Sequence, residues 1–138
     1  MEERGPVELT WEGGEHKFYL GIRELRALQE KCDAGPPWIA RRLLSDQWLV
    51  DDIVETVRLG LKGGGLDGAE ANKLIRKFVE PYPLTESLPL AVAVLQSALF
   101  SVEDDPVGEF EPQAATESQQ KIDPSQGEKS DSPEFTDF

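Results

Sequence analysis

The sequence contains few side chains that could bind a metal ion or act as a nucleophile. Its 138 residues include one cysteine, Cys32, and one histidine, His16. A lone cysteine excludes an internal disulfide and a zinc site built from several cysteines. A reducing cytoplasm is the compartment that best fits this cysteine usage, so we expect a cytoplasmic protein. Because metal-binding side chains are so few, we also expect no metal site and no cofactor.

Long apolar runs and positive charges are also scarce. No segment approaches the roughly 18 apolar residues of a membrane span, and residues 1–6 lack the apolar core of a secretory signal. The chain carries 14 Lys and Arg residues against 27 Asp and Glu residues, a formal net charge of −13. Binding along a DNA backbone requires basic side chains that replace counterions. We therefore expect neither a membrane nor a nucleic acid as a partner.

The negative charge is concentrated at the C-terminal end. Residues 103–138 hold 11 acidic and 2 basic residues, whereas residues 1–102 hold 16 and 12. The larger apolar side chains of the last stretch are few: Val107, Phe110, Ile122, Phe135 and Phe138. Such a composition buries too little apolar area to offset the entropy of ordering. We predict one folded domain over residues 1–102 and a disordered acidic tail over 103–138, acting as a solubilising extension or as an arm whose phenylalanines anchor a partner.

An alternating pattern near the start of the chain predicts a β-hairpin over residues 7–20. Val7, Leu9 and Trp11 alternate with polar residues, which is the period of a half-buried strand. The glycine pair at 13–14 suits a tight turn, after which the chain returns as a second strand. Because two strands alone are only marginally stable in water, this hairpin must pack on the rest of the domain.

Helical spacing of apolar residues follows the hairpin. The expected helices cover roughly residues 22–32, 38–44, 49–61, 67–78 and 87–99. Proline or glycine separates most of these segments and ends the helices. The last segment is the most apolar, so we expect it in the core. The predicted fold class is α+β, with an N-terminal β-hairpin packed on a small bundle of about four to five helices.

The two residues best suited to catalysis lack the neighbours that catalysis needs. His16 lies beside the hairpin turn without a nucleophile or carboxylate partner in the pattern, so we interpret it as an exposed surface residue. Cys32 falls on the apolar stripe near the end of a helix, away from a base or a helix N-terminus. We interpret it as a small buried hydrophobic residue.

Three further motifs also favour structural roles. Lys62 precedes the glycines at 63–65, whereas a phosphate-binding loop places its lysine after them, so we interpret this segment as a helix end and a flexible connector. The acidic pair at 51–52 and the acidic triplet at 103–105 lack the spacing of a calcium loop. The first complements a helix dipole and the second begins the tail. We predict no catalytic, cofactor-binding or metal-binding residue.

A protein-binding surface is better supported. Trp38 and Trp48 flank a short helix that carries Arg41 and Arg42, and we expect both arginines to face outward. Tryptophan and arginine are over-represented among residues that dominate interface energies. These four residues are therefore the candidate partner-binding surface. The alternative, that both indoles lie in the core, is about equally well supported because aromatic side chains also dominate cores.

The order of these elements resembles a family of small phage proteins that also occurs in gene transfer agents. The similarity covers roughly residues 7–102 and rests on order and spacing rather than on a chemical motif. It runs through residues 7–20, 22–30, 52–65, 69–71 and 83–100. Members of the family are encoded among tail genes and have an N-terminal hairpin followed by helices. They are described as tail assembly chaperones, and under some labels as tail tube proteins; a long acidic tail is not part of the pattern.

The resemblance implies a non-enzymatic tail assembly chaperone. Such a protein binds and solubilises the tape-measure protein, a long helical chain with exposed apolar stripes, until tail tube protein assembles around it. The tail tube protein is then a second partner, and self-association is left open. One alternative is a structural tube or connector subunit retained in the particle, although one short hairpin offers little strand for a ring of sheets. Another is an acidic nucleic-acid mimic, but residues 1–102 carry a net charge of only −4.

Overall fold

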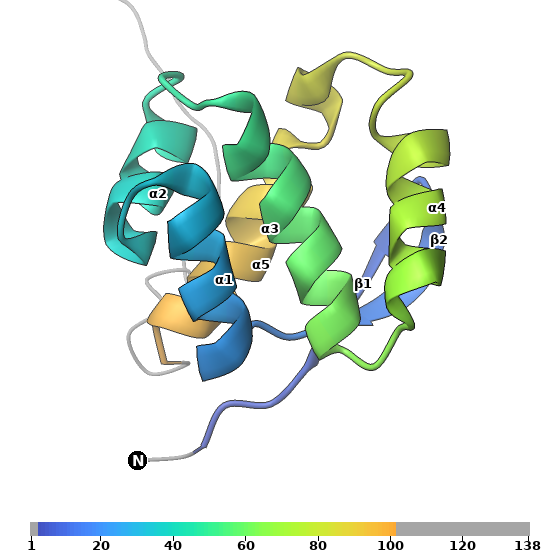
Figure 1. Cartoon of the computed structure of the whole chain (residues 1–138), viewed down its shortest axis with the longest axis horizontal. Coiled ribbons are helices and arrows are strands. Elements are labelled where there is room, and N and C mark those ends of the chain that lie inside the picture. The colour runs from blue at the N-terminus through green and yellow to red at the C-terminus, as the bar shows by residue number, and fades with distance from the viewer. Residues whose placement is uncertain (1–2, 102–138) are drawn as a thin grey trace, which may run out of the picture. The chain divides into compact units, whose positions relative to one another are not determined.

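The computed structural model describes residues 3–101 and begins with the predicted hairpin (Figure 1). Strands β1 (Val7–Trp11) and β2 (Gly14–Phe18) form an antiparallel two-stranded sheet. The register pairs Val7 with Phe18 at the open end and Trp11 with Gly14 at the turn. Gly14 adopts a φ of 110°, which a residue without a Cβ reaches at little cost.

Five α-helices and one 3₁₀ turn follow within the described residues. They are α1 (Ile22–Cys32), α2 (Pro36–Leu44), α3 (Val50–Gly63), α4 (Gly68–Phe78), η1 (Leu84–Glu86) and α5 (Leu88–Leu99). This arrangement confirms the predicted α+β class, a hairpin followed by a small helical bundle. None of the helices between residues 3 and 101 is long and apolar enough to cross a membrane. The predicted tail, residues 103–138, lies outside the described residues.

Helix α3 occupies the centre of the arrangement (Figure 1). It packs against α1, α4, α5 and β2. Its fully buried apolar side chains are Ile53, Val57 and Leu61, at the three- to four-residue spacing that the sequence predicted. The apolar stripe of α3 therefore forms the middle of the core.

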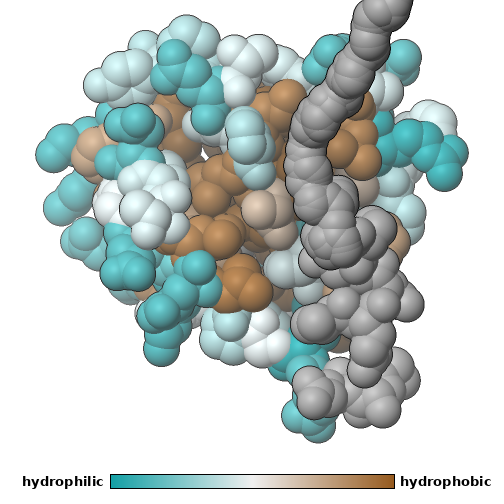
Figure 2. Space-filling view, turned by 180° about the vertical axis from the view of Figure 1, so that it is seen from behind, coloured by the Kyte–Doolittle hydropathy of each residue, from teal (hydrophilic) through white to brown (hydrophobic). Residues whose placement is uncertain are grey.

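Helix α5 reaches the core through one face only. Its buried side chains are Ala91, Val94 and Leu95, whereas Leu88 and Val92 are half-buried. The helix packs mainly on α2 and α3. It contains no charged residue between 87 and 100, so its other side is also largely apolar. Seen from behind, apolar side chains gather in the middle of this face of the molecule (Figure 2).

The hairpin packs on the helices through aromatic side chains. Phe18 is fully buried, and the ring of Trp11 meets the rings of Phe18 and Phe78 edge-on, with centroids 6.2 Å apart in each pair. Gly60 of α3 leaves room for this contact, because a Cβ there would lie 3.2 Å from the Phe18 ring. The expectation that the hairpin packs on the rest of the domain is confirmed.

The glycines at the end of α3 allow close approach to the hairpin. A Cβ on Gly63 would lie 1.8 Å from the carbonyl oxygen of Tyr19, and one on Gly64 would lie 2.0 Å from that of Lys17. The backbone N–H of Tyr19 also donates to the carbonyl of Gly60 at 2.9 Å. The segment does end a helix, as predicted, but Gly63 and Gly64 are also required by packing.

Candidate protein-interaction site

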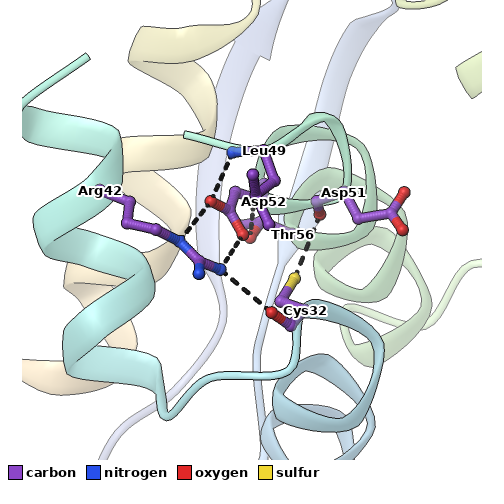
Figure 3. Close-up of polar contacts among 6 residues, drawn as sticks. All are labelled: Cys32, Arg42, Leu49, Asp51, Asp52 and Thr56. Atoms are coloured by element: carbon purple, nitrogen blue, oxygen red, sulfur yellow. Dashed lines mark hydrogen bonds and ion pairs between the residues drawn. The ribbon is translucent and has the colours of Figure 1, made fainter. Parts of the chain in front are cut away.

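Arg42 is directed into the fold (Figure 3). Its Nε and Nη2 donate to Oδ2 and Oδ1 of Asp52 at 2.8 and 2.6 Å, and Nη2 also donates to the carbonyl of Cys32 at 3.1 Å. The Arg42 side chain is 15% exposed and that of Asp52 is 0% exposed. The expectation that Arg42 faces outward is wrong, because the buried carboxylate of Asp52 requires a paired cation.

Asp52 also completes the start of α3. Its Oδ2 accepts a hydrogen bond from the backbone N–H of Leu49 at 2.8 Å, which satisfies one donor at the helix N-terminus. The hydroxyl of Thr56 donates to the Asp52 carbonyl at 2.7 Å. Hydrogen bonding to Asp52 raises the pKa of the Arg42 guanidinium above its usual value. The cluster therefore joins α1, α2 and α3 and has a structural role.

Cys32 and His16 do not form an open reactive site. The thiol of Cys32 is 2% exposed and donates to the carbonyl of Asp51 at 3.4 Å. Burial is the main reason that its pKa rises to about 12, so the interpretation as a buried hydrophobic residue is confirmed. His16 is half-buried rather than exposed, because its Nδ1 accepts a hydrogen bond from Nε1 of Trp11 at 2.9 Å. Among residues 3–101, no cluster of His, Cys, Asp and Glu is placed to hold a metal ion.

Helix α2 presents an exposed face that we call the α2 surface, made of Trp38, Arg41 and Leu44. Trp38 is 52% exposed and Leu44 is 63% exposed. The guanidinium of Arg41 lies 5.2 Å from the centre of the Trp38 ring, where a cation interacts favourably with the aromatic face. Residues three apart lie on one side of a helix, so the three side chains form a continuous surface.

The predicted partner-binding residues are therefore divided between the surface and the interior. Trp38 and Arg41 are exposed together, Trp48 is half-buried against the core, and Arg42 is turned inward. The sequence interpretation missed Leu44, although its spacing from Arg41 gave a signal. Leu49 and Val50 are two more exposed apolar residues, where α3 begins. Partner binding by any of these residues stays a prediction.

Comparison with known families assigns residues 4–101 to a family. A model of the family described as phage tail tube protein, GTA-gp10, matches residues 4–101, well over half of the 138 residues. The chain belongs to this phage tail tube family. No curated protein and no solved structure matches it.

Membership of the tail tube family confirms the coarser part of the resemblance. The chain is a protein of a phage or gene-transfer-agent tail gene cluster. The matched residues include the hairpin and every helix of the described part. The description names a tail tube protein and not a chaperone, so it supports the structural-subunit alternative better than the chaperone that we expected.

Proposed function

We propose that this member of the tail tube family is a structural subunit of a phage-type tail and works through protein–protein contacts without catalysis. The single observation that carries the proposal is the family match over residues 4–101. Its partners would be neighbouring tail proteins. The acidic nucleic-acid mimic has no comparable support.

The α2 surface supports a role in protein contacts. An exposed indole with an arginine stacked on it combines the two residue types most enriched where interface energy is concentrated. Leu44 extends this surface with a further exposed apolar side chain. Because the ring contact already orients Trp38 and Arg41, docking a partner there costs less side-chain entropy than docking on free side chains.

A non-catalytic role is supported by the state of the two most reactive side chains. The Cys32 thiol is buried and its pKa is about 12, so almost no thiolate forms at neutral pH. The Nδ1 atom of His16 is occupied by the indole N–H of Trp11.

A tail assembly chaperone is the second candidate. The observation that favours it is the size of the sheet, since the described part of the chain contains one pair of five-residue strands. Rings of subunits joined through sheets need more strand than this. The half-buried apolar side chains of α5 would instead cover an apolar stripe on a helix of a tape-measure protein.

Complementation of a gene deletion tests whether tail formation requires the α2 surface or the reactive side chains of His16 and Cys32. Particles made without the gene should lack tails under either candidate function. We expect His16→Ala and Cys32→Ala to restore tails, and the double variant Trp38→Ala/Leu44→Ser to fail although it folds. Arg26→Ala, an exposed change on α1, is the matched control. Failure of a folded His16 or Cys32 variant, or full restoration by the α2 variant, would contradict this account.

A further inference from the structure

Within the described residues, the outer edge of β1 has backbone hydrogen-bonding groups without a backbone partner. The strand pairs end at Trp11–Gly14 and Val7–Phe18, so these pairs and Leu9–His16 exchange the hydrogen bonds of the ladder. The backbone N–H and C=O groups of Glu8 and Thr10 therefore point away from β2. Within residues 3–101, no backbone hydrogen bond from another segment reaches them.

The opposite edge of the hairpin is covered. The end of α3 lies against β2 so closely that a Cβ on Gly64 would fall 2.0 Å from the carbonyl oxygen of Lys17. Just beyond β2, the N–H of Tyr19 is bonded to the carbonyl of Gly60. Because an exposed strand edge is a template for pairing with another chain, β1 is the side of this sheet that can accept a further strand.

An apolar groove of about 410 Å³ runs alongside the free edge. Its lining includes Leu9 and Trp11 of β1, Phe78 of α4, and Pro89, Leu90 and Ala93 of α5. Leu9 and Trp11 are on the side of the sheet that faces the helices. A strand added beside β1 would direct every second side chain into this groove, since side chains alternate along a strand.

The charges around the groove indicate the composition of such a strand. Glu12 and Glu86 are exposed residues that line the groove, and Glu8 is exposed on the outer side of β1. None of the residues that line the groove is basic. Lys77 is close to the lining, with its Nζ 5.4 Å from the centre of the Phe78 ring, and Lys17 lies opposite Glu8 on β2. The excess of carboxylates favours a basic segment.

We propose that β1 binds an extended segment of a second tail protein as a third strand. Apolar side chains of this segment alternate into the groove, and its Lys or Arg side chains meet the carboxylates of Glu8, Glu12 and Glu86. This is recognition by strand addition, in which backbone hydrogen bonds give affinity and the groove gives specificity. Only the identification of the partner as a tail protein rests on the proposed function.

A second copy of this chain is the less favourable occupant. The net charge of the chain is −13. Pairing of two β1 strands would also bring Glu8 and Glu12 of one copy near the same residues of the other, and like charges across strands are destabilising.

Amide hydrogen exchange on the full chain tests the pairing. The probe is a blocked peptide of four Lys-Val repeats. Saturating peptide should slow exchange of the Glu8 and Thr10 amides about tenfold or more, because both would enter a ladder, while the already bonded amides of Leu9 and Trp11 change little. A peptide of Glu-Val repeats, and one with its lysines and valines in two blocks, should bind at least about tenfold more weakly.

Two pairs of variants locate the binding. Thr10→Pro removes an outward N–H that the hairpin does not use and should abolish the protection, whereas Thr10→Ala retains it. Ala93→Arg fills the groove and should weaken binding about tenfold or more, whereas Gln96→Arg, on another side of α5, should not. The second pair keeps the test valid if Thr10→Pro does not fold.

Three results would overturn the proposal. The first is unchanged amide exchange at Glu8 and Thr10 with saturating peptide. The second is equal affinity for the block peptide and the alternating peptide, and the third is a dimer of this chain that protects these amides without peptide. The last result would assign the edge to a second copy. Since the experiment uses no particles, its failure leaves the proposed tail role intact, and absence of the chain from particles would leave the strand pairing intact.

Discussion

The guanidinium of Arg42 and the carboxylate of Asp52 form a two-point ion pair, with Nη2 2.6 Å from Oδ1 and Nε 2.8 Å from Oδ2. The pair fixes α2 against the first turn of α3, and the carbonyl of Cys32 brings the end of α1 to the same guanidinium. A fully buried carboxylate with one cationic partner depends strongly on that partner. This dependence leads to the first prediction.

Replacing Arg42 should destabilise the fold severely. We expect Arg42→Met to lower the free energy of unfolding by about 3–5 kcal/mol, because the buried charge of Asp52 is left unpaired. Urea unfolding followed by circular dichroism measures the change. Arg41→Met, an exposed change on the same helix, is the control and should alter stability by about 0.5 kcal/mol or less.

A double variant separates the charge from the helix cap. In Arg42→Met/Asp52→Asn the amide oxygen can still accept from the N–H of Leu49, while the buried charge is gone. The double variant should therefore be more stable than Arg42→Met alone. Equal stability of the two would show that the unpaired charge is not the cause of the loss.

The end of α3 should tolerate no side chain at residue 63. A methyl group on Gly63 would collide with the carbonyl oxygen of Tyr19, so Gly63→Ala should cost about 1–3 kcal/mol or more. Gly68→Ala is the matched control, since the nearest atom to its Cβ is Cε of Lys62 at 3.7 Å. Thermal unfolding of the two variants should differ by several degrees. Equal melting temperatures would contradict the close approach.

The buried thiol should make part of the stability depend on alkaline pH. The pKa of Cys32 is raised from 9.0 to about 12 in the folded chain. Above pH 9 the unfolded chain therefore loses this proton while the folded chain keeps it. The free energy of unfolding consequently falls as the pH rises towards 12.

Comparison with Cys32→Ala isolates this effect from other titrating groups. Between about pH 8 and about pH 10, the stability of the natural chain relative to the variant should fall by about 1 kcal/mol. Urea unfolding at several pH values measures the difference. If the difference stays constant over this range, the thiol does not titrate as its burial requires.

Removing the exposed indole should leave the fold almost unchanged. Because Trp38 is 52% exposed, Trp38→Ala should lower the free energy of unfolding by about 1 kcal/mol or less. Trp11→Ala should cost about 3–5 kcal/mol, since that ring meets Phe18 and Phe78. Similar losses in both variants would mean that the α2 surface is part of the core.

Local patterns were enough to predict the hairpin and the five α-helices of this fold, but not the 3₁₀ turn η1. The alternation of Val7, Leu9 and Trp11 predicted β1, and helical spacing predicted all five helices. Asp67 caps α4, its Oδ2 accepting from the N–H of Ala69 at 3.1 Å. Glu70, in the first turn of the same helix, pairs with Lys73 at 3.6 Å.

Contacts between distant segments decided what the sequence could not. Arg42 turns inward because Asp52, ten residues later, is buried beside it, and helical spacing alone does not reveal such a pair. The same holds for Gly63, whose restriction comes from Tyr19. Of the four predicted partner-binding residues, Trp38 and Arg41 are exposed together. Which edge of the hairpin is free also depends on a distant segment, because the end of α3 covers β2 and leaves the edge of β1 open.

Quantitative mass spectrometry of purified particles tests the central proposal most directly. A structural tail subunit should be present in a fixed molar ratio to the other tail proteins, and that ratio should survive further purification. Absence of the chain from tailed particles, together with its recovery from assembling cells in a complex with the tape-measure protein, would contradict the structural role and favour the chaperone.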